Sequence, residues 1–354
     1  MYIVLAILLF GILIAVHELG HFIAAKKLGV QVNEFAIGMG PKLWSRQRGE
    51  TLYCLRALPI GGACVMEGED EALENPRAFT AQKRWKRVII LVAGAFTNFI
   101  FGLIVLLIIG MGIKFTVSTT LTSLAPGFPN EGSDGLMAGD TIVSLNGNRL
   151  YYSEDFSMFV QLPAAQDGVV DLVVRRNGKK LNLDDFPLIP REYTENGETQ
   201  LRYGFNFAAS EATFGDKIQY SFYKAFNFVR IVRVSLVELF TGGANLNDLQ
   251  GPVGIVSTIN EVANDPDIET TRERLVYVLN FGALIAINLA VMNLLPIPAL
   301  DGGRIFGLFV TFIVEKIARR RINPKYEGYI HAAGLGLLLL LMVVVLVNDI
   351  VRIV

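Results

Sequence analysis

Long apolar runs alternate with polar stretches along this chain of 354 residues. Residues 2–16 are apolar apart from the hydroxyl of Tyr2, and the pattern continues to Ala25. This gives about 24 residues, which is enough for a helix to cross a bilayer. Three more apolar runs follow, at 88–113, 275–300 and 330–347. The pattern predicts a polytopic α-helical membrane protein with four transmembrane helices, in segments 1–26, 86–113, 273–303 and 329–354.

The first apolar run is interpreted as a retained span and not as a signal peptide. No basic residue precedes it, and no small-residue cleavage site follows it cleanly. A short apolar stretch at 305–314 is interpreted as the end of the third span or as a helix near the interface, because it is too short to cross a bilayer.

The distribution of basic residues predicts the orientation of these spans. Lys26 to Arg87 contains eleven Lys and Arg residues, and Arg304 to Lys325 contains six. The positive-inside rule places both stretches, within 27–85 and 304–328, in the cytoplasm. The stretch from Lys114 to Asp216 has eight basic and fourteen acidic residues, which is consistent with the opposite side. Four spans with both basic loops inside place both termini outside.

Between the second and third spans, the pattern changes to short alternating segments. Thr141 to Leu145 and Val169 to Val174 have strand character, and Asn146-Gly147 and Asn177-Gly178 are typical of hairpin turns. We expect a β-rich domain at 114–190 and a linker at 191–272. Within that linker, 217–240 is apolar but carries charges at intervals. It is therefore expected to form an amphipathic helix on the membrane surface, with a fifth span as the less favoured alternative.

Composition narrows the function classes. Hydrophobic residues make up 52% of the chain, as expected for a membrane protein. The formal net charge is −1, so nothing points to nucleic acid. Cys54 and Cys64 are the two cysteines, and we expect free thiols and not a disulfide-stapled fold.

Two of the three histidines stand together in the first span, as His17-Glu18-Leu19-Gly20-His21. Positions i and i+4 share one face of a helix, so both imidazoles can bind one metal ion. Glu18 stands beside them, where it could take a proton from a metal-bound water. Buried, unpaired polar groups are costly inside a membrane, which disfavours a chance pair of histidines. His331, at the start of the fourth span, is expected to have no such role.

Two histidines leave a zinc site one protein ligand short. Asp301 is the strongest candidate, because it closes the apolar run in which Pro296 and Pro298 interrupt the helix. Broken helices at membrane depth need protein or water partners for their freed backbone groups. An Asp that merely marks the membrane surface is an equally good interpretation of this feature alone.

The paired motifs, His17 to His21 and Asn293-x2-Pro296-x4-Asp301-Gly302, resemble the signature of the site-2 protease family of intramembrane zinc metalloproteases. Within it the chain resembles the bacterial regulator of sigma-E protease type, with one PDZ domain, over nearly its whole length. The segment Gly251 to Ile255 resembles the one that precedes the family's third span. The resemblance implies a Zn2+ cofactor held by His17, His21 and Asp301. It also implies Glu18 as the general base and Asn293 as a residue that holds substrate or stabilises the oxyanion.

Two further segments fit the same family. Residues 38–41 and 59–62 contain glycines that flank strand-like sequence. The family implies a cytoplasmic, membrane-associated β-hairpin there, whose exposed strand could hold an unwound substrate near Gly61 and Gly62. Glycines that simply make turns are the alternative. Gly135 to Gly147 resembles a protease-type PDZ signature, so an inserted extracytoplasmic PDZ domain is expected. Whether that domain captures C-termini or acts as a steric gate stays open.

The expected function is cleavage of transmembrane segments in single-span proteins. The resemblance implies substrates such as anti-sigma factors already cut by an upstream site-1 protease, or remnant signal peptides. It also implies a bacterial plasma membrane location, with the active site near the cytoplasmic side and lipid as a partner. Two alternatives are a metal-binding or transport protein, in which Glu18 would be dispensable, and an inactive PDZ membrane scaffold, in which metal would be irrelevant.

Overall fold

The computed structural model describes most of the chain, and the account below refers to those residues. They are 2–69, 74–162, 165, 167–195, 198–241, 270–319, 329–330, 333–337, 339–340 and 342–343. The chain divides into two units, which are described separately. The first comprises Met1–Leu106 and Asn247–Val354, and the second comprises Leu107–Leu246.

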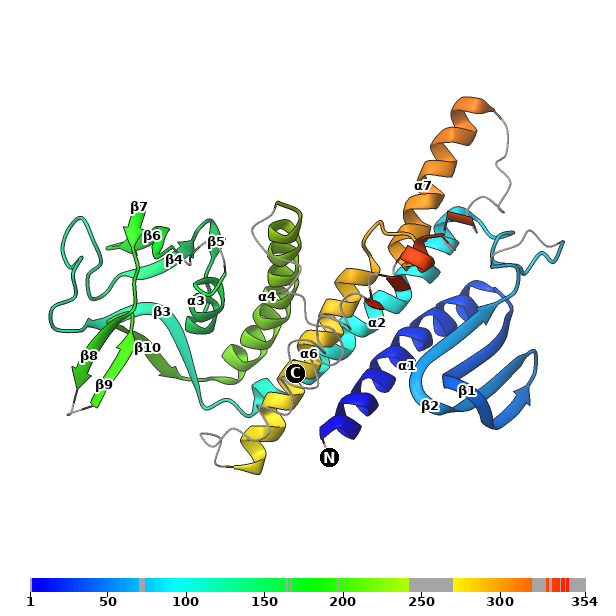
Figure 1. Cartoon of the computed structure of the whole chain (residues 1–354), viewed down its shortest axis with the longest axis horizontal. Helices are drawn as coiled ribbons and strands as arrows, with labels where there is room; N and C mark the ends of the chain where they lie inside the picture. The colour runs from blue at the N-terminus through cyan, green and yellow to red at the C-terminus, as the bar shows by residue number, and fades with distance from the viewer. Residues whose placement is uncertain are drawn as a thin grey trace. The chain divides into compact units, whose positions relative to one another are not determined.

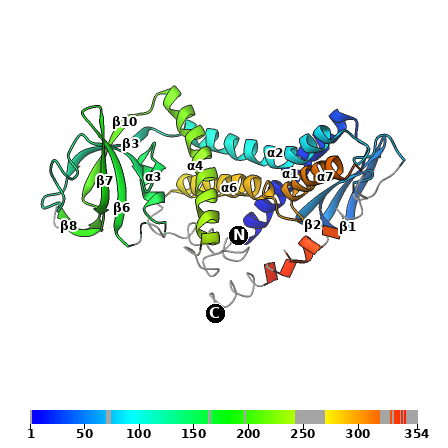
Figure 2. The same ribbon diagram turned by 90° about the horizontal axis from the view of Figure 1, so that it is seen from above.

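Three long helices form the body of the first unit: α1 (Tyr2–Leu28), α2 (Arg84–Met111, which continues into the second unit) and α6 (Thr271–Asn293). Leu13, Ile285 and Ala286 are buried where these helices meet, and Phe101 packs against them. Figures 1 and 2 show α2 and α6 running alongside one another. Close packing through small residues is typical of membrane helices.

The long apolar helices match the first three predicted spans. Those with the length and composition to cross a membrane are Leu8–Leu28 within α1, Arg84–Met111 and Thr271–Asn293. Many of their outward-facing side chains are apolar, such as Ile12 in α1 and Phe96 in α2. The chain is therefore a membrane-integral protein. Of the predicted fourth span, 329–354, residues 329–330, 333–337, 339–340 and 342–343 are described; the rest lies outside the described residues, as do His331 and Gly251 to Ile255.

Local signals explain where these helices start and stop. Helix α1 ends at Leu28, followed by Gly29 at φ 84°. The N–H groups of Gly29 and Val30 donate back to the carbonyls of Lys26 and Ala25, which is a Schellman C-cap. Helix α6 starts with a capping box, in which Thr270 accepts from the N–H of Glu273 at 3.2 Å.

The expected β-hairpin is present as β1 (Val32–Arg48) and β2 (Thr51–Met66). Both strands bend, at Gly38 and Gly61, which have φ of 86° and 87°. The bends fold the hairpin on itself, so that Phe35 pairs with both Tyr53 and Cys64. The segment Gly62–Met66 therefore pairs with β1 along one edge and with no described strand along the other. Its association with the membrane stays a prediction.

A charged network and an apolar cluster fix the hairpin to the helices. Lys26 and Arg77 bind Glu50, in the hairpin turn, at 2.6–2.7 Å. Arg77 and Lys26 hold the pKa of Glu50 at about 2. In addition, buried residues from the hairpin, α1, α2 and α7 (Asp301–Ala318) form one apolar cluster, whose members include Val32, Phe35, Met66, Phe79, Ile90, Leu91 and Leu308. The two cysteines are buried free thiols, as predicted.

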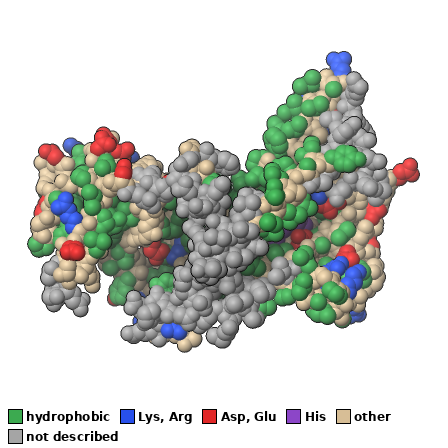
Figure 3. All heavy atoms as spheres, viewed as in Figure 1, with side chains coloured by type: hydrophobic (Ala, Val, Ile, Leu, Met, Phe, Trp, Pro, Cys, Tyr) green, Lys and Arg blue, Asp and Glu red, His purple; other side chains and the backbone are tan. Residues whose placement is uncertain are grey.

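Helix α6 ends at Asn293, before Pro296 and Pro298, and α7 (Asp301–Ala318) follows. Proline removes a backbone donor and cannot continue a helix, which accounts for the break. Residues 304–318 are therefore helical, which agrees with the interpretation of 305–314 as helix and not with a loop that begins at residue 304. The apolar run from Ile305 to Val314 extends the helix begun at Asp301. Hydrophobic side chains cover much of α7 in Figure 3. The exposed apolar residues of this helix include Phe306, Phe309, Phe312 and Ile317.

The second unit is β-rich, as predicted. Its strands are β3 (Phe115–Leu124), β4 (Thr141–Leu145), β5 (Asn148–Arg149), β6 (Val169–Arg176), β7 (Lys179–Pro187), β8 (Arg191–Glu195), β9 (Glu198–Arg202) and β10 (Phe205–Glu211). The main sheet has the order β10-β3-β4-β6-β7, with β5 paired to β4 and a separate β8–β9 hairpin. Both predicted Asn-Gly turns are present, with φ positive at all four residues, as two-residue hairpins require.

The boundary predicted at residue 190 is too early. Strand β10 pairs with β3 and completes the main sheet, so the domain extends into the segment expected to be a linker. Phe205 and Phe207 of β10 face Phe156 of α3 (Ser153–Phe159) at 5.4–5.6 Å between ring centroids. Pairing to a distant strand is a tertiary interaction, and the local sequence of β10 carries no signal for it.

Residues 217–240, predicted to form a helix, lie within α4 (Phe214–Thr241). Asp155, 3% exposed, is the centre of the contact between α3 and α4. Its carboxylate accepts from the N–H groups of Tyr151 and Tyr152 at 2.6 and 3.1 Å, and from the amide of Asn227 in α4. Burial raises the pKa of Asp155, while the two backbone hydrogen bonds lower it.

Replacing Asp155 with Ala should loosen α4 from α3. The change leaves buried donors without an acceptor, and we expect it to cost about 3 kcal/mol. Hydrogen exchange of the α3 and α4 amides in detergent should rise accordingly. Asp184→Ala is the matched control, because it removes an exposed carboxylate in β7 and should change the free energy of unfolding by less than about 0.5 kcal/mol. Equal exchange in both variants would contradict the assignment of Asp155 as the anchor.

Candidate metal centre

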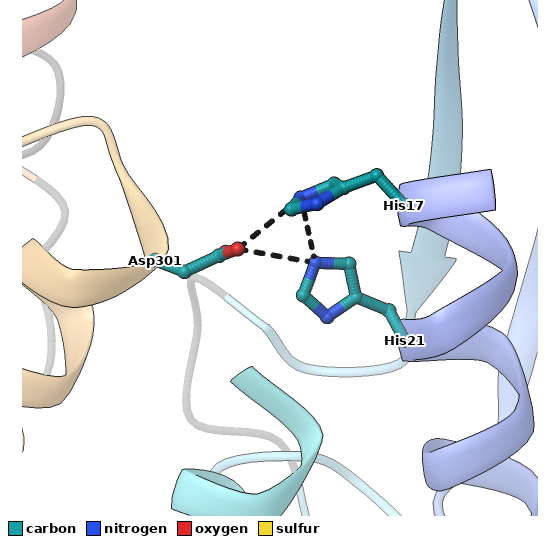
Figure 4. Close-up of side chains that lie close together, drawn as sticks. All are labelled: His17, His21 and Asp301. Atoms are coloured by element: carbon teal, nitrogen blue, oxygen red, sulfur yellow. Dashed lines mark hydrogen bonds and ion pairs between the residues drawn. The ribbon is translucent and has the colours of Figure 1, made fainter. Parts of the chain in front are cut away.

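The two histidines of the motif lie one turn apart on α1, and Asp301 approaches them from the start of α7. Figure 4 shows the three side chains pointing toward one another. His17 Nε2 and His21 Nε2 are 3.1 Å apart, and Asp301 Oδ2 lies 3.2 and 3.3 Å from them. The structure thus brings together the two histidines and the Asp that the sequence singled out.

This triangle has the dimensions of a metal site. Zinc bonds to nitrogen and oxygen are about 2.0–2.1 Å long, so two ligands of a tetrahedral site lie roughly 3.3 Å apart. The three distances fall at this spacing. Asp301 Oδ2 is also buried and has no hydrogen-bond partner in the described part of the chain. A buried carboxylate oxygen facing two imidazole nitrogens fits a divalent cation.

The second nitrogen of each histidine has a partner. His21 Nδ1 lies 2.8 Å from the carbonyl oxygen of Ile90 in α2. A proton on Nδ1, donated to that carbonyl, leaves Nε2 free to bind a metal, and such partners orient metal ligands. His17 Nδ1 lies 3.4 Å from the side-chain amide of Asn293, at the end of α6. No pattern in the sequence indicates that Ile90 takes part.

The ligands line a cavity of about 240 Å³. Glu18 and Asn293 share it, together with Cys64 and Met66 of β2 and with Glu69 and Arg304. Gly62 lies so close to Glu18 that a Cβ at this glycine would be 3.0 Å from Glu18 Cγ. The bent edge of the hairpin is therefore next to the candidate base, whereas Gly61 contacts Met39 instead.

Glycines allow the close approaches on which the site depends. A Cβ at Gly302 or Gly303 would lie 2.2–2.3 Å from backbone atoms of Leu294, Leu295 or Ile297, so α7 could not start there. On α2, a Cβ at Gly94 would lie 2.4 Å from His21 Nε2. Gly94 was not among the predicted site residues. Its one signal was the run of small residues at 93–95 within an apolar span, which is typical of close helix packing.

Gly94→Ala should disturb the metal site. The added methyl group would collide with the nitrogen of His21 that faces Asp301. We expect zinc affinity to fall roughly 10- to 100-fold, the range seen when groups that orient metal ligands are disturbed. Gly307→Ala on α7 is the matched control, because a Cβ there meets nothing within 4 Å. Competition with a zinc chelator would measure the affinities, and equal values would show that α2 does not position His21.

Comparisons with known proteins identify the family of the chain. The model of peptidase family M50 matches residues 5–341. A Clostridium perfringens protein, provisionally named a zinc metalloprotease, is 36% identical over 353 residues, covering 99% of each chain. The Geobacillus kaustophilus zinc metalloprotease RasP is 29% identical, covering 97% of this chain and 96% of its own. The Bacillus subtilis regulator of sigma-W protease RasP is 28% identical, covering 98% and 97%. The chain therefore belongs to peptidase family M50.

Proposed function

We propose that this protein hydrolyses peptide bonds within the transmembrane segments of single-span membrane proteins. It is a zinc metalloprotease of the site-2 type, as its family membership indicates. The observation that carries the finer proposal is the position of the candidate ligands. His17 and His21 lie within Leu8–Leu28, a helix long and apolar enough to cross a membrane. A substrate must therefore reach the site at membrane depth.

His17, His21 and Asp301 are the proposed zinc ligands, because their ligand atoms lie within 4.8 Å of one another. Zinc, when bound, lowers the pKa of a coordinated water to about 7 and polarises a carbonyl group. Glu18 is the proposed general base. Its carboxylate lines the same cavity, where it takes a proton from the attacking water and passes it to the leaving nitrogen.

Asn293 is proposed to hold the substrate or to stabilise the oxyanion. Its amide lines the cavity. The 3.4 Å contact with His17 is long for a hydrogen bond, so a bound carbonyl group can compete for the amide. An N–H donor aimed at a developing negative charge is the usual form of oxyanion stabilisation.

Gly61 and Gly62 are proposed to help bind an extended substrate. A peptide bond inside a helix has its carbonyl group hydrogen-bonded within the helix, so the substrate must unwind before attack. The unpaired edge of Gly62–Met66 offers backbone groups to such a strand. Gly62 is also close to Glu18, which places this edge beside the candidate base.

The wider setting of the protein belongs to the same proposal. We infer a bacterial plasma membrane protein with four spans, both termini outside, and the β-rich unit as an extracytoplasmic PDZ domain. Helix α4 is proposed to lie on the membrane surface, because it exposes Phe222 and Phe226. The printed name of the Bacillus subtilis relative refers to sigma-W regulation. This supports anti-sigma factors, trimmed by an upstream protease, as a substrate class.

Mapping the cut tests the proposal. A tagged single-span model substrate would be incubated with the purified protein in detergent, and the products would be sequenced by mass spectrometry. We expect a cut between two residues of the apolar segment. A cut confined to the flanking polar residues would contradict intramembrane cleavage while leaving the protease activity in place.

A further inference from the structure

An ion pair lines the cavity beside the candidate metal ligands. Arg304 Nη1 donates to Glu69 Oε1 at 2.6 Å, and the two side chains are 26% and 24% exposed. Among the described side chains that line the cavity, Arg304 is the one Lys or Arg, alongside the carboxylates of Glu18, Glu69 and Asp301. Neither Glu69 nor Arg304 belongs to the motifs that identify the metal site.

The pair connects two walls of the cavity. Glu69 lies three residues beyond Met66, the end of β2, and Cys64 and Met66 line the cavity. Arg304 lies three residues beyond Asp301 on α7. Residues three apart lie on one face of a helix, so Arg304 is on the side of α7 that carries the candidate ligand.

Neighbouring contacts hold both ends of the pair in place. Thr80 binds the carbonyl oxygen of Gly68 through its hydroxyl at 2.9 Å, next to Glu69. On α7, Leu308 is one turn beyond Arg304 and is 3% exposed, within the cluster that contains Met66 and Phe79. The ion pair therefore lies along α7 between the metal ligand and this apolar contact. Partly buried charge pairs are costly to break on one side, because the remaining charge loses its partner.

We propose that the Glu69–Arg304 ion pair is a clasp that positions the unpaired edge of Gly62–Met66 beside the metal ligands. This inference rests on the proposed function, in which that edge pairs with an extended substrate. Apolar contacts through Leu308 bring α7 and the hairpin together but do not fix how far β2 slides along the helix. The ion pair between Glu69 and Arg304 fixes this position, because it joins the segment after β2 to the turn of α7 that follows Asp301. Both are positioning residues and take no part in proton transfer.

The test compares Glu69→Gln, Arg304→Gln and the double reversal Glu69→Arg/Arg304→Glu. For a tagged single-span substrate in detergent, each single change should raise KM roughly tenfold, within the range of couplings measured between paired residues. We expect kcat and the zinc content per chain to stay within about twofold of wild type, because zinc binding and proton transfer use other groups. The double reversal should bring KM back to near the wild-type value.

A second measurement needs no substrate. Hydrogen exchange of the Cys64–Met66 amides should accelerate in both single variants and return toward wild type in the double reversal. Arg84→Gln is the matched control, because the ion pair of Arg84 with Glu315 joins α2 to α7 and does not line the cavity. This control should leave KM and exchange unchanged.

Three outcomes would contradict the proposed positioning role of the Glu69–Arg304 ion pair. The first is a normal KM with normal exchange in both single variants. The second is a double reversal as impaired as the singles while zinc is retained, which would mean that Arg304 acts on the substrate itself. The third is loss of zinc in the single variants, which would assign the pair to the metal site. Failure of the proposed function has a different signature, since wild type would then not cleave while the exchange results still report on the clasp.

Discussion

Glu18→Gln is expected to abolish cleavage while zinc binding persists. Glutamine has the same shape as glutamate but cannot accept a proton at neutral pH, and the three candidate ligands remain unchanged. General acid–base catalysis contributes about 10²–10⁴ in rate, so turnover should fall by at least this factor. Zinc per chain, measured by mass spectrometry of the metal, should equal that of wild type.

Glu315→Gln is the control for this prediction, because Glu315 lies near the end of α7, in an ion pair with Arg84, and does not line the cavity. It should leave turnover within about twofold, as is usual for changes to exposed ion pairs. If Glu18→Gln kept normal activity, the proposed base would be wrong. The same result would favour a protein that binds metal without hydrolysis.

Asp301→Ala is expected to remove both zinc and activity. The change takes away the carboxylate that completes the triangle with His17 and His21, leaving two protein ligands where catalytic zinc sites have three. Zinc affinity should fall more than about 100-fold, beyond the effect of altering groups that only orient ligands. Competition with a chelator of known affinity would measure the loss.

The matched control is Asp184→Ala, which changes an exposed carboxylate in β7 and should leave zinc affinity unchanged. Normal zinc binding by Asp301→Ala would contradict the proposed ligand set. If Asp301→Ala lost activity but kept its zinc, Asp301 would have a role in catalysis other than metal binding.

Much of the metal site could be predicted from the sequence, because its first part is local. His17, Glu18 and His21 lie within one turn of a helix, and helical periodicity alone places the imidazoles on one face. Asp301 is 280 residues farther along the chain. Its inclusion depended on a broken helix and on the family resemblance, and the structure brings it within 3.3 Å of both histidines.

The features that the sequence did not reveal are tertiary ones. Gly94 matters because α2 crosses α1 at the histidines, and no local pattern states which helices cross where. Glu69 and Arg304 are 235 residues apart, and each alone is an ordinary charged residue near a predicted interface. Strand β10 was missed for the same reason, because it pairs with β3 residues that lie 81 to 96 positions earlier, from Phe205 with Leu124 to Glu211 with Phe115.

The β-hairpin was predicted correctly as an element, but its shape was not. Glycine and proline at 38–41 and 59–62 indicated turns in the sequence. In the structure, Gly38 and Gly61 instead bend two long strands, so that Gly62–Met66 returns beside β1 and next to Glu18. The apolar stretch at 305–314, interpreted as the end of a span or a helix near the interface, lies within α7, which continues to Ala318.

The most direct test of zinc-dependent intramembrane proteolysis is one cleavage assay on a tagged single-span substrate. Wild type, Glu18→Gln, and wild type treated with a chelator would be compared, with zinc added back to the last. The account predicts that wild type cuts, that Glu18→Gln and the chelated protein do not, and that zinc restores the chelated protein. Cleavage that persists in Glu18→Gln or after complete removal of zinc would contradict it.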